Sequence, residues 1–329
     1  MISLRGRSEE MAFLLCGTVA VAVLVGGSPY WMYNMTVVAL FATAAIGLNI
    51  MLGYAGQISF TQSAFMAVGG YGSAILGTKL AVDPWLAMIF SAVLAAIGAL
   101  LIGIPLLRLR GHYFGMASFA LALGTPSFLL AAASLTNGPL GIAGVPPLRF
   151  AGVSFLDPIP IYLLAWGVCI GAFLVEISLL KSHVGRAWRA ISTNQDVARS
   201  LGIDARKYKL LTLAIAAVMA SLAGSLYVEF QQYVAPDIFD IGLIMTIYLI
   251  VYAGGRGSIA GPLVGAVFYI VVPQLIGSLE QFQHLVFSAL LIAIIVLRPN
   301  GIMGRGRQYA PVERILPLWV QRRLRRDYD

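Results

Sequence analysis

The stretch KSHVGRAWRAISTNQDVARSLGIDARKYK, residues Lys181 to Lys209, is the only long polar interruption in the hydrophobic body of this chain. It carries seven lysine and arginine residues. It lies between two apolar runs that are each long enough to cross a bilayer, for which about 20 residues are needed. A loop of this length and charge between two spans predicts a folded segment outside the membrane, with a solvated helical linker as the alternative.

The residue pattern of this stretch predicts two short helices. Four apolar residues recur at i, i+3, i+4 and i+7, the spacing of one helix face, and the nearby arginines fall away from that face. The four are Val184, Ala187, Trp188 and Ile191. Ser192 or Thr193 is the predicted N-cap of the second helix. Gly202 is its predicted C-terminal stop.

The composition places the whole chain in a membrane. Of its 329 residues 59% are hydrophobic and only 11% are charged, with a mean hydropathy of +0.86. Soluble domains carry about 25% charged residues. Cys16 and Cys169 lie inside apolar runs, so a disulfide is not expected, and the three histidines are too scattered to suggest a metal site.

Apolar runs of spanning length divide the chain into about ten predicted transmembrane helices. They lie near residues 11–28, 34–52, 60–80, 85–107, 113–134, 159–180, 208–229, 239–254, 259–278 and 282–297. The first run follows two arginines, as a signal peptide would, but it is long and lacks a small-residue cleavage site, so a retained span is predicted. The eighth is short, which indicates a tilted, interrupted or partly protein-buried segment. The predicted fold is an all-α integral membrane protein.

The positive charges predict the orientation. With ten spans, 20 of the 22 lysines and arginines fall on the side of the two termini, and only Lys79 and Arg149 fall on the other. By the positive-inside rule both termini and the 181–209 loop, between spans six and seven, are cytoplasmic. The net charge of +8 therefore reflects topology, and nucleic-acid binding is not expected. Residues 1–304 form the predicted transmembrane domain, and 305–329 form a basic tail, either amphipathic on the inner leaflet or disordered.

The segment between spans two and three, residues 52–59, is too apolar for an ordinary loop and too rich in glycine for a helix interior. Irregular backbone at membrane depth persists only where protein or a water-filled cavity satisfies it. Polar side chains gather around it: Asn49, Gln57, Ser59, Thr61, Gln62 and Ser63. Two interpretations are equally compatible with this pattern. The segment either lines a solute pathway or serves glycine-mediated packing with interhelical hydrogen bonds.

Two further segments and one carboxylate bear on function. Residues 135–158 are dense in proline and glycine, which predicts an ordered outer cap that is either a connector or a docking site. Residues 254–262 resemble a phosphate-binding loop only superficially, because the chain has no Gly-Lys dipeptide. Glu176 is the only carboxylate well inside a span. It lies about one turn from Lys181, so it either reaches the interface or has an interhelical partner.

Motifs spread in order over residues 35–305 resemble the permease subunits of branched-chain amino acid ABC importers, specifically the LivM-like half. The matching stretches are LGYAGQISFTQSAFMAVGGYGSAIL, LRLRGHYFGMASFA, TNGPLGIAGVP, GRAWRAISTNQDVARSLGIDARKYKLLTLAIAAVMASLAGSLY, YAGGRGSIAGPLVGA and LRPNGIMG. The fourth resembles the cytoplasmic loop through which such permeases are coupled to their ATPases. This loop departs from the family pattern at Ser192-Thr193-Asn194 and at Arg199.

The resemblance implies a non-enzymatic transporter subunit in the bacterial inner membrane. Its expected partners are a homologous second permease, two cytoplasmic ABC ATPases, a periplasmic substrate-binding protein and membrane lipids. The chain itself is expected to bind no cofactor, and ATP and Mg²⁺ are used by the ATPases. The residues expected to couple to the ATPases are Gly185, Arg186, Ala190, Ile191, Asp196, Leu201 and Gly202. Those expected near the substrate pathway are Asn49, Tyr54, Gln57, Ser59 and Thr61.

Related permeases handle urea, short amides or aromatic acids, so the resemblance implies a branched-chain amino acid or a related small polar, amide or aromatic solute. A stand-alone secondary transporter is the main alternative, with Glu176 as its coupling group. A membrane-embedded enzyme is a weaker one, because no histidine has an evident partner in a span.

Overall fold

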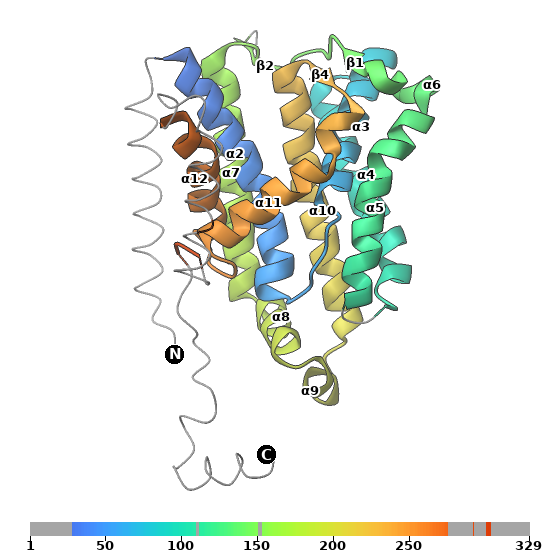
Figure 1. Ribbon diagram of the computed structural model, residues 1–329, viewed down its shortest axis with the longest axis vertical. Helices are drawn as coiled ribbons and strands as arrows, with labels where there is room; N and C mark the ends of the chain where they lie inside the picture. The colour runs from blue at the N-terminus through green and yellow to red at the C-terminus, as the bar shows by residue number, and fades with distance from the viewer. Residues whose placement is uncertain (1–27, 110–111, 151–152, 276–291, 293–300, 304–329) are drawn as a thin grey trace, which may run out of the picture.

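The computed structural model describes residues 28–109, 112–150, 153–275, 292 and 301–303. Long helices run side by side between a cap of short strands at one end and two short helices at the other (Figure 1). The described part of the chain is thus predominantly helical, as predicted. The first and tenth predicted spans and the tail 305–329 lie outside the described residues, apart from residue 28 and a single helical residue at 292.

Three helices form the interior: α2 (Pro29–Asn49), α3 (Gln62–Lys79) and α10 (Ala205–Gln231). Helix α2 continues directly into a π-helix, η1 (Ile50–Tyr54). Within α2 and η1, 89% of the most apolar stretch is buried by protein, whereas only 33% of the corresponding stretch of α4 is. Helix α2 is therefore central, and α4 lies at the periphery.

Helices α3 and α10 approach so closely that backbone meets backbone. A Cβ atom on Gly69 would lie 2.0 Å from the Ser221 carbonyl oxygen, and one on Gly224 would lie 2.1 Å from that of Met66. Ser225 Oγ donates a hydrogen bond to the Gly69 carbonyl at 3.0 Å. Small residues permit this approach between membrane helices. Gly69 and Gly224 therefore serve helix packing.

The peripheral helices are α4 (Pro84–Leu106), α5 (His112–Ala131) and α7 (Pro158–Lys181). They expose many large apolar side chains, among them Leu101, Phe128 and Leu163. Such surfaces are unfavourable in water but suit hydrocarbon, where helices satisfy all their backbone groups internally. Five described helices are long and apolar enough to cross a bilayer: α2 with η1, α4, α5, α7 and α10.

Two shorter apolar helices follow, α11 (Ile241–Gly254) and α12 (Gly261–Leu275). The 14 residues of α11 extend about 21 Å, less than the roughly 30 Å hydrocarbon core, so the prediction of a short eighth segment is confirmed. The glycine-rich turn at residues 254–262 lets α11 and α12 approach each other closely. A Cβ on Gly254 would lie 1.9 Å from the Gly261 carbonyl oxygen.

The cap consists of short elements from the predicted turn-rich segment and from the α10–α11 connection. They are α6 (Ala133–Thr136), η2 (Gly138–Leu140), β1 (Ile142–Ala143), β2 (Arg149–Phe150), β3 (Val153–Ser154), β4 (Tyr233–Val234) and η3 (Pro236–Phe239). Strand β1 pairs antiparallel with β4, and β2 with β3. Lys79 and Arg149, the two basic residues predicted on the side opposite the termini, both lie at this end. Lys79 donates to the Ser134 carbonyl, and the Arg149 carbonyl accepts from Trp85 Nε1.

Candidate functional site

The end opposite the cap is formed by α8 (His183–Thr193) and α9 (Gln195–Ser200), the two helices predicted from the polar stretch. Helix α8 begins with Ser182 as N-cap, whose Oγ accepts from Val184 N at 3.1 Å. Its apolar face is buried as predicted. Trp188 has no exposed surface, and its Nε1 donates to the Tyr208 carbonyl at 3.1 Å, which fixes α8 against the first turn of α10.

The joint between α7 and α8 is tight. A Cβ on Gly185 would lie 2.6 Å from Leu180 Cα, so only glycine fits there. Arg189 donates through a guanidinium nitrogen to the Leu180 carbonyl at 3.1 Å, which satisfies a carbonyl in the last turn of α7. Arg189 is therefore away from the apolar face, as predicted, but it is engaged in structure and only half-exposed.

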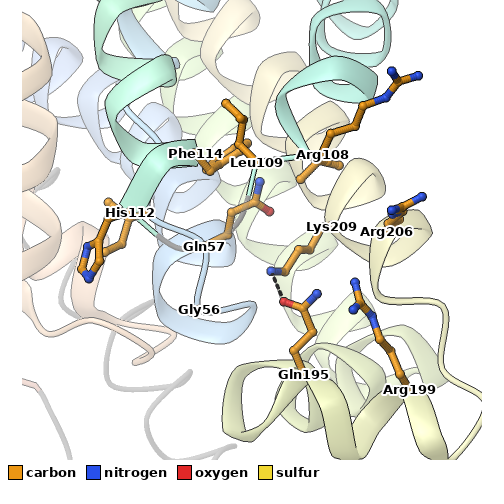
Figure 2. Close-up of a pocket in the computed structure, with 12 residues that line it drawn as sticks. Gly56, Gln57, Arg108, Leu109, His112, Phe114, Gln195, Arg199, Arg206 and Lys209 are labelled. Atoms are coloured by element: carbon orange, nitrogen blue, oxygen red, sulfur yellow. Dashed lines mark hydrogen bonds between the residues drawn. The ribbon is translucent and has the colours of Figure 1, made fainter.

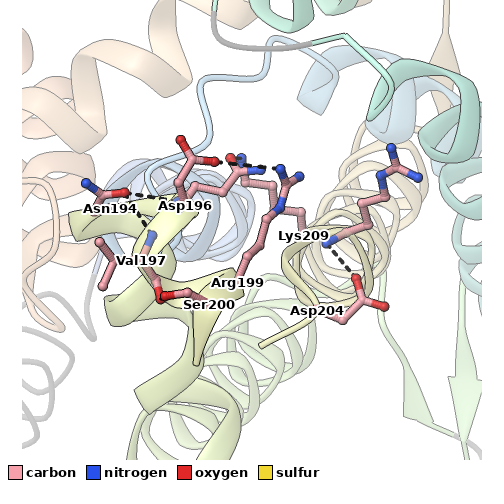
Figure 3. A network of polar contacts seen from close by, with 9 residues as sticks. Asn194, Asp196, Val197, Arg199, Ser200, Asp204 and Lys209 are labelled. Carbon is pink, nitrogen blue, oxygen red and sulfur yellow. Dashed lines mark hydrogen bonds and ion pairs between the residues drawn. The ribbon is translucent and has the colours of Figure 1, made fainter. Parts of the chain in front are cut away.

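The N-cap of α9 is Asn194, which corrects the predicted cap at Ser192 or Thr193. Asn194 Oδ1 accepts from Asp196 N at 3.0 Å and Val197 N at 3.1 Å (Figure 3). The hydroxyls of Ser192 and Thr193 instead donate back to the Arg189 carbonyl, because α8 continues through Thr193. Of these three adjacent residues, Asn194 alone has the extended backbone that an N-cap residue needs.

Helix α9 ends in a Schellman motif at Gly202, as predicted. Gly202 has a φ of +82° and donates to the Arg199 carbonyl at 2.9 Å. Ile203 N donates to the Ala198 carbonyl at 3.0 Å, the second bond of the motif. Asp204 then caps α10 through its Oδ1, and the backbone N–H of Lys207 holds the pKa of this carboxyl below its ordinary value.

The two helices have a small core of their own. Ile191, Ala198 and Ala205 are buried together, with Ile203 and Tyr208 packed against them. This core joins α8, α9 and the start of α10 into one unit, which we call the α8–α9 unit (residues 182–205). Because its members interlock through apolar contacts and caps, a force on α9 is transmitted to α10.

The residues predicted to couple to the ATPases differ in exposure. Exposed on the α8–α9 unit are Arg186, Asp196, Leu201 and Gly202, whereas Ala190 is half-buried and Gly185 and Ile191 are buried. The buried pair shapes the unit from within and offers no surface to a partner. Val197 is absent from the predicted set. With Leu201 it forms an apolar tip, the two residues being 54% and 74% exposed.

The α8–α9 unit touches the irregular segment that follows η1. Gly56 has a φ of +64°, and a Cβ on it would lie 3.1 Å from Ser192 Cβ. The backbone of the segment is thus irregular, as predicted, and it lies directly against α8. A displacement of α8 would press on this backbone.

The predicted pathway residues lie around this segment and are mostly buried. Ser59 and Thr61 share a hydroxyl–hydroxyl bond of 3.0 Å, and the Ser59 carbonyl accepts from Tyr248 Oη at 3.0 Å. Tyr54 is half-buried. Gln57 is 4% exposed, and its side-chain amide makes no hydrogen bond within the described residues. These neutral polar groups are gathered in one region, and their place on a pathway stays a prediction.

Asn49, also predicted near the pathway, is completely buried and joins three segments. Its Oδ1 accepts from Gly257 N at 2.8 Å, and its Nδ2 donates to the Ser258 carbonyl at 3.0 Å and to Glu176 Oε1 at 2.9 Å. The amide is fully engaged in this conformation. Glu176 is likewise fully buried, so it has an interhelical partner and does not reach the interface.

Tyr248 also belongs to this region, although the sequence analysis did not single it out. Its ring stacks on Phe60 with centroids 4.7 Å apart, and its hydroxyl reaches the segment after η1. The two tyrosines within this largely aliphatic short span, Tyr248 and Tyr252, are the sequence feature that could have indicated it. In the ranges that the structure describes, no three His, Cys, Asp or Glu side chains are grouped to hold a metal ion.

Comparison with known proteins agrees with this architecture. The family described as branched-chain amino acid transport system / permease component matches residues 12–297. The high-affinity branched-chain amino acid transport system permease LivM of Escherichia coli K12 is 27% identical over 317 residues, covering 88% of this chain and 75% of its own. None of the solved structures matches.

Both permease types of such systems resemble the chain. The LivH permease of Salmonella typhimurium is 29% identical over 294 residues, covering 83% of this chain and 94% of its own. A probable LivM permease of Methanocaldococcus jannaschii is 23% identical over 315 residues, covering 80% and 90%. The family match extends over most of the chain, including the α8–α9 unit and the η1 segment. This chain is a membrane permease of the branched-chain amino acid transport permease family.

Proposed function

We propose that this chain is one permease subunit of an ATP-driven importer in the bacterial inner membrane, and that cytoplasmic ATPases dock on the α8–α9 unit. The observation that carries this proposal is the apolar tip of Val197 and Leu201 on an otherwise self-contained unit. An apolar tip exposed beyond the membrane end of the bundle is suited to insertion into a partner's groove.

The same unit provides a route for mechanical coupling. Trp188 fixes α8 to the start of α10, and Ser192 lies against Gly56 in the segment after η1. ATP-driven movement of the docked subunits would displace α10 and the η1 segment together, and with them the region of the predicted pathway. ATP and Mg²⁺ would be bound by the ATPases.

The proposed solute is a branched-chain amino acid or a related small polar or amide molecule. The assignment rests on the similarity to LivM and LivH, which are permeases of branched-chain amino acid transport systems. The pathway region offers neutral polar groups at Ser59 and Thr61 next to the Phe60–Tyr248 ring pair. Such a lining suits a molecule with a polar head and a compact apolar side chain.

We also propose the remaining parts of the assembly. A homologous second permease would pack beside this one, as the likeness to both LivM and LivH relatives suggests. A periplasmic binding protein would dock on the cap formed by α6, η2 and the paired strands. The concentration of basic residues at the other end supports its cytoplasmic placement.

The test is co-purification in mild detergent followed by mass spectrometry. Val197→Asp combined with Leu201→Asp should release the ATPase subunits and retain the second permease. Leu140→Asp is the matched control, because Leu140 is 83% exposed at the cap end. A chain that purifies alone and transports alone in liposomes would overturn the proposal in favour of a secondary transporter.

A further inference from the structure

A basic pocket lies between α9 and the rest of the bundle, separate from the apolar tip. It has a volume of about 160 Å³. Four segments contribute: the backbone after η1, the α4–α5 connection, α9 and the first turn of α10 (Figure 2). Segments distant in sequence thus converge on one space at the basic end of the molecule.

The charges that line the pocket have one sign. Among the described residues its charged lining is Arg108, Arg199, Arg206 and Lys209, and it includes neither aspartate nor glutamate. Asp196 approaches Arg199 to 3.8 Å, but its side chain is 89% exposed and leaves most of that guanidinium's donors available. Lys209 Nζ donates to Gln195 Oε1 at 2.8 Å, which orients the ammonium within the site.

Gln57 supplies a second and independent indication of a ligand. It lines this pocket and is 4% exposed, yet neither its amide nitrogen nor its amide oxygen has a hydrogen-bond partner within the described residues. Buried polar groups in native proteins are almost always partnered. An amide donor that faces a basic pocket and has no protein partner fits a site that receives an acceptor from outside.

The chemistry of the lining selects the class of ligand. Guanidinium and ammonium donors bind phosphate oxygens strongly, and a neutral amide donor adds direction. A free amino acid is a poorer match, because its ammonium group would meet no carboxylate in the lining. We propose that this pocket binds a phosphate-class oxyanion, presented either by the headgroup of an anionic phospholipid or by a free phosphate ester. The proposal does not depend on which solute is transported.

Occupancy would connect parts that otherwise have few direct bonds. Arg199 belongs to α9, Arg108 to the end of α4 and Lys209 to α10. A bound oxyanion shared among them would hold the α8–α9 unit against the α4–α5 connection. The ligand would therefore stabilise one position of this unit relative to the bundle.

The experiment uses the monodisperse full-length chain in neutral detergent and follows its thermal unfolding. Sodium phosphate and glycerol phosphate are titrated at constant ionic strength against sodium chloride, and short-chain phosphatidylglycerol against short-chain phosphatidylcholine. We expect the phosphate-class anions to raise Tm. A response to phosphatidylglycerol alone assigns the lipid as the source, and a response to glycerol phosphate as well assigns free esters.

Three variants make the test specific to the pocket. Arg206→Gln with Lys209→Gln should raise the half-saturating concentration at least about tenfold. Gln57→Leu should raise it several-fold with no change of charge, which a diffuse electrostatic effect would not do. Lys207→Gln is the control, since Lys207 lies on the same helical turn, is 85% exposed and does not line the pocket. An anion effect no larger than that of chloride, or equal losses in the Lys207 and Lys209 variants, would overturn the proposal.

Discussion

Asn49 Nδ2 donates to Glu176 Oε1 at 2.9 Å across the interface of α2 and α7, and neither residue has any exposed surface. The same amide holds the backbone of residues 257 and 258. One side chain thus connects the end of α2, the inner part of α7 and the α11–α12 turn. This junction lies where α2 passes into η1, immediately before the segment that contacts α8.

Replacing Asn49 with leucine should destabilise the protein strongly. It would leave Oε1 of the fully buried Glu176 without this partner, at about 1–3 kcal/mol, and would remove the part-buried hydrogen bonds to Gly257 N–H and the Ser258 carbonyl, at about 0.5–1.5 kcal/mol each. We expect a total loss of about 3 kcal/mol or more in the free energy of unfolding in mixed micelles. Thr43→Val is the control, because its buried hydroxyl donates to the Ala39 carbonyl of its own helix. Equal losses of unfolding free energy in the two variants would contradict the role of Asn49 in joining these segments.

Glu176→Gln should leave ATP-driven uptake close to that of the unchanged protein. Glutamine retains the oxygen that accepts from Asn49, so the junction persists without a carboxyl group. A secondary transporter that uses Glu176 to carry protons predicts the opposite. Uptake is measured with ATP and with an imposed pH gradient, and loss of gradient-driven uptake in the variant would favour that alternative.

Gly224→Ala should lower the stability of the α3–α10 interface. The added methyl group would lie 2.1 Å from the Met66 carbonyl oxygen, and overpacking of this kind costs about 1–3 kcal/mol. Gly167→Ala on α7 is the matched change, since nothing lies within 4 Å of a Cβ there. That variant should be neutral or gain up to about 1 kcal/mol from helix propensity. Equal Tm values for the two variants would rule out the close approach.

Asp204→Asn should reduce stability at neutral pH and have little effect in acid. The pKa of Asp204 is lowered by the backbone N–H groups at the start of α10, so its ionised form stabilises the folded state. That contribution is present above the unfolded-state pKa and is lost as pH falls through the folded-state pKa. The Tm difference between the two proteins should therefore shrink from pH 7 toward about pH 3. A difference that is constant with pH would refute this role.

The loop and its two helices were predictable because local signals are sufficient there. The spacing of Ala187, Trp188 and Ile191 defines a buried face, and Gly202 provides the left-handed residue that ends α9. The N-cap was misplaced because three adjacent residues have side chains able to cap. Which of them adopts extended backbone depends on where α8 ends. The position of that end is influenced by the packing of Ile191 against Ala198 and Ala205.

The junction at Asn49 was not predictable, because it depends on the rotation of apolar helices about their axes. Helix α7 is hydrophobic on all sides, so its sequence does not indicate which face meets α2, and Glu176 was equally compatible with the interface. The meeting of the two glycine-rich turns is similarly non-local. A Cβ on Gly53 would lie 2.4 Å from Gly257 N, a contact between residues about 200 positions apart.

The most direct test of the central claim measures ATP hydrolysis and leucine uptake together in proteoliposomes that contain the co-purified assembly. Arg186→Glu reverses an exposed charge on α8, and Gly202→Pro removes an N–H bonded to the Arg199 carbonyl at a φ that proline cannot adopt. Arg256→Glu is the control, because it reverses an exposed charge outside both the α8–α9 unit and the cap. We expect normal membrane insertion and loss of ATP-driven uptake in both loop variants, with uptake intact in the control. Normal uptake in the loop variants would contradict coupling through the α8–α9 unit.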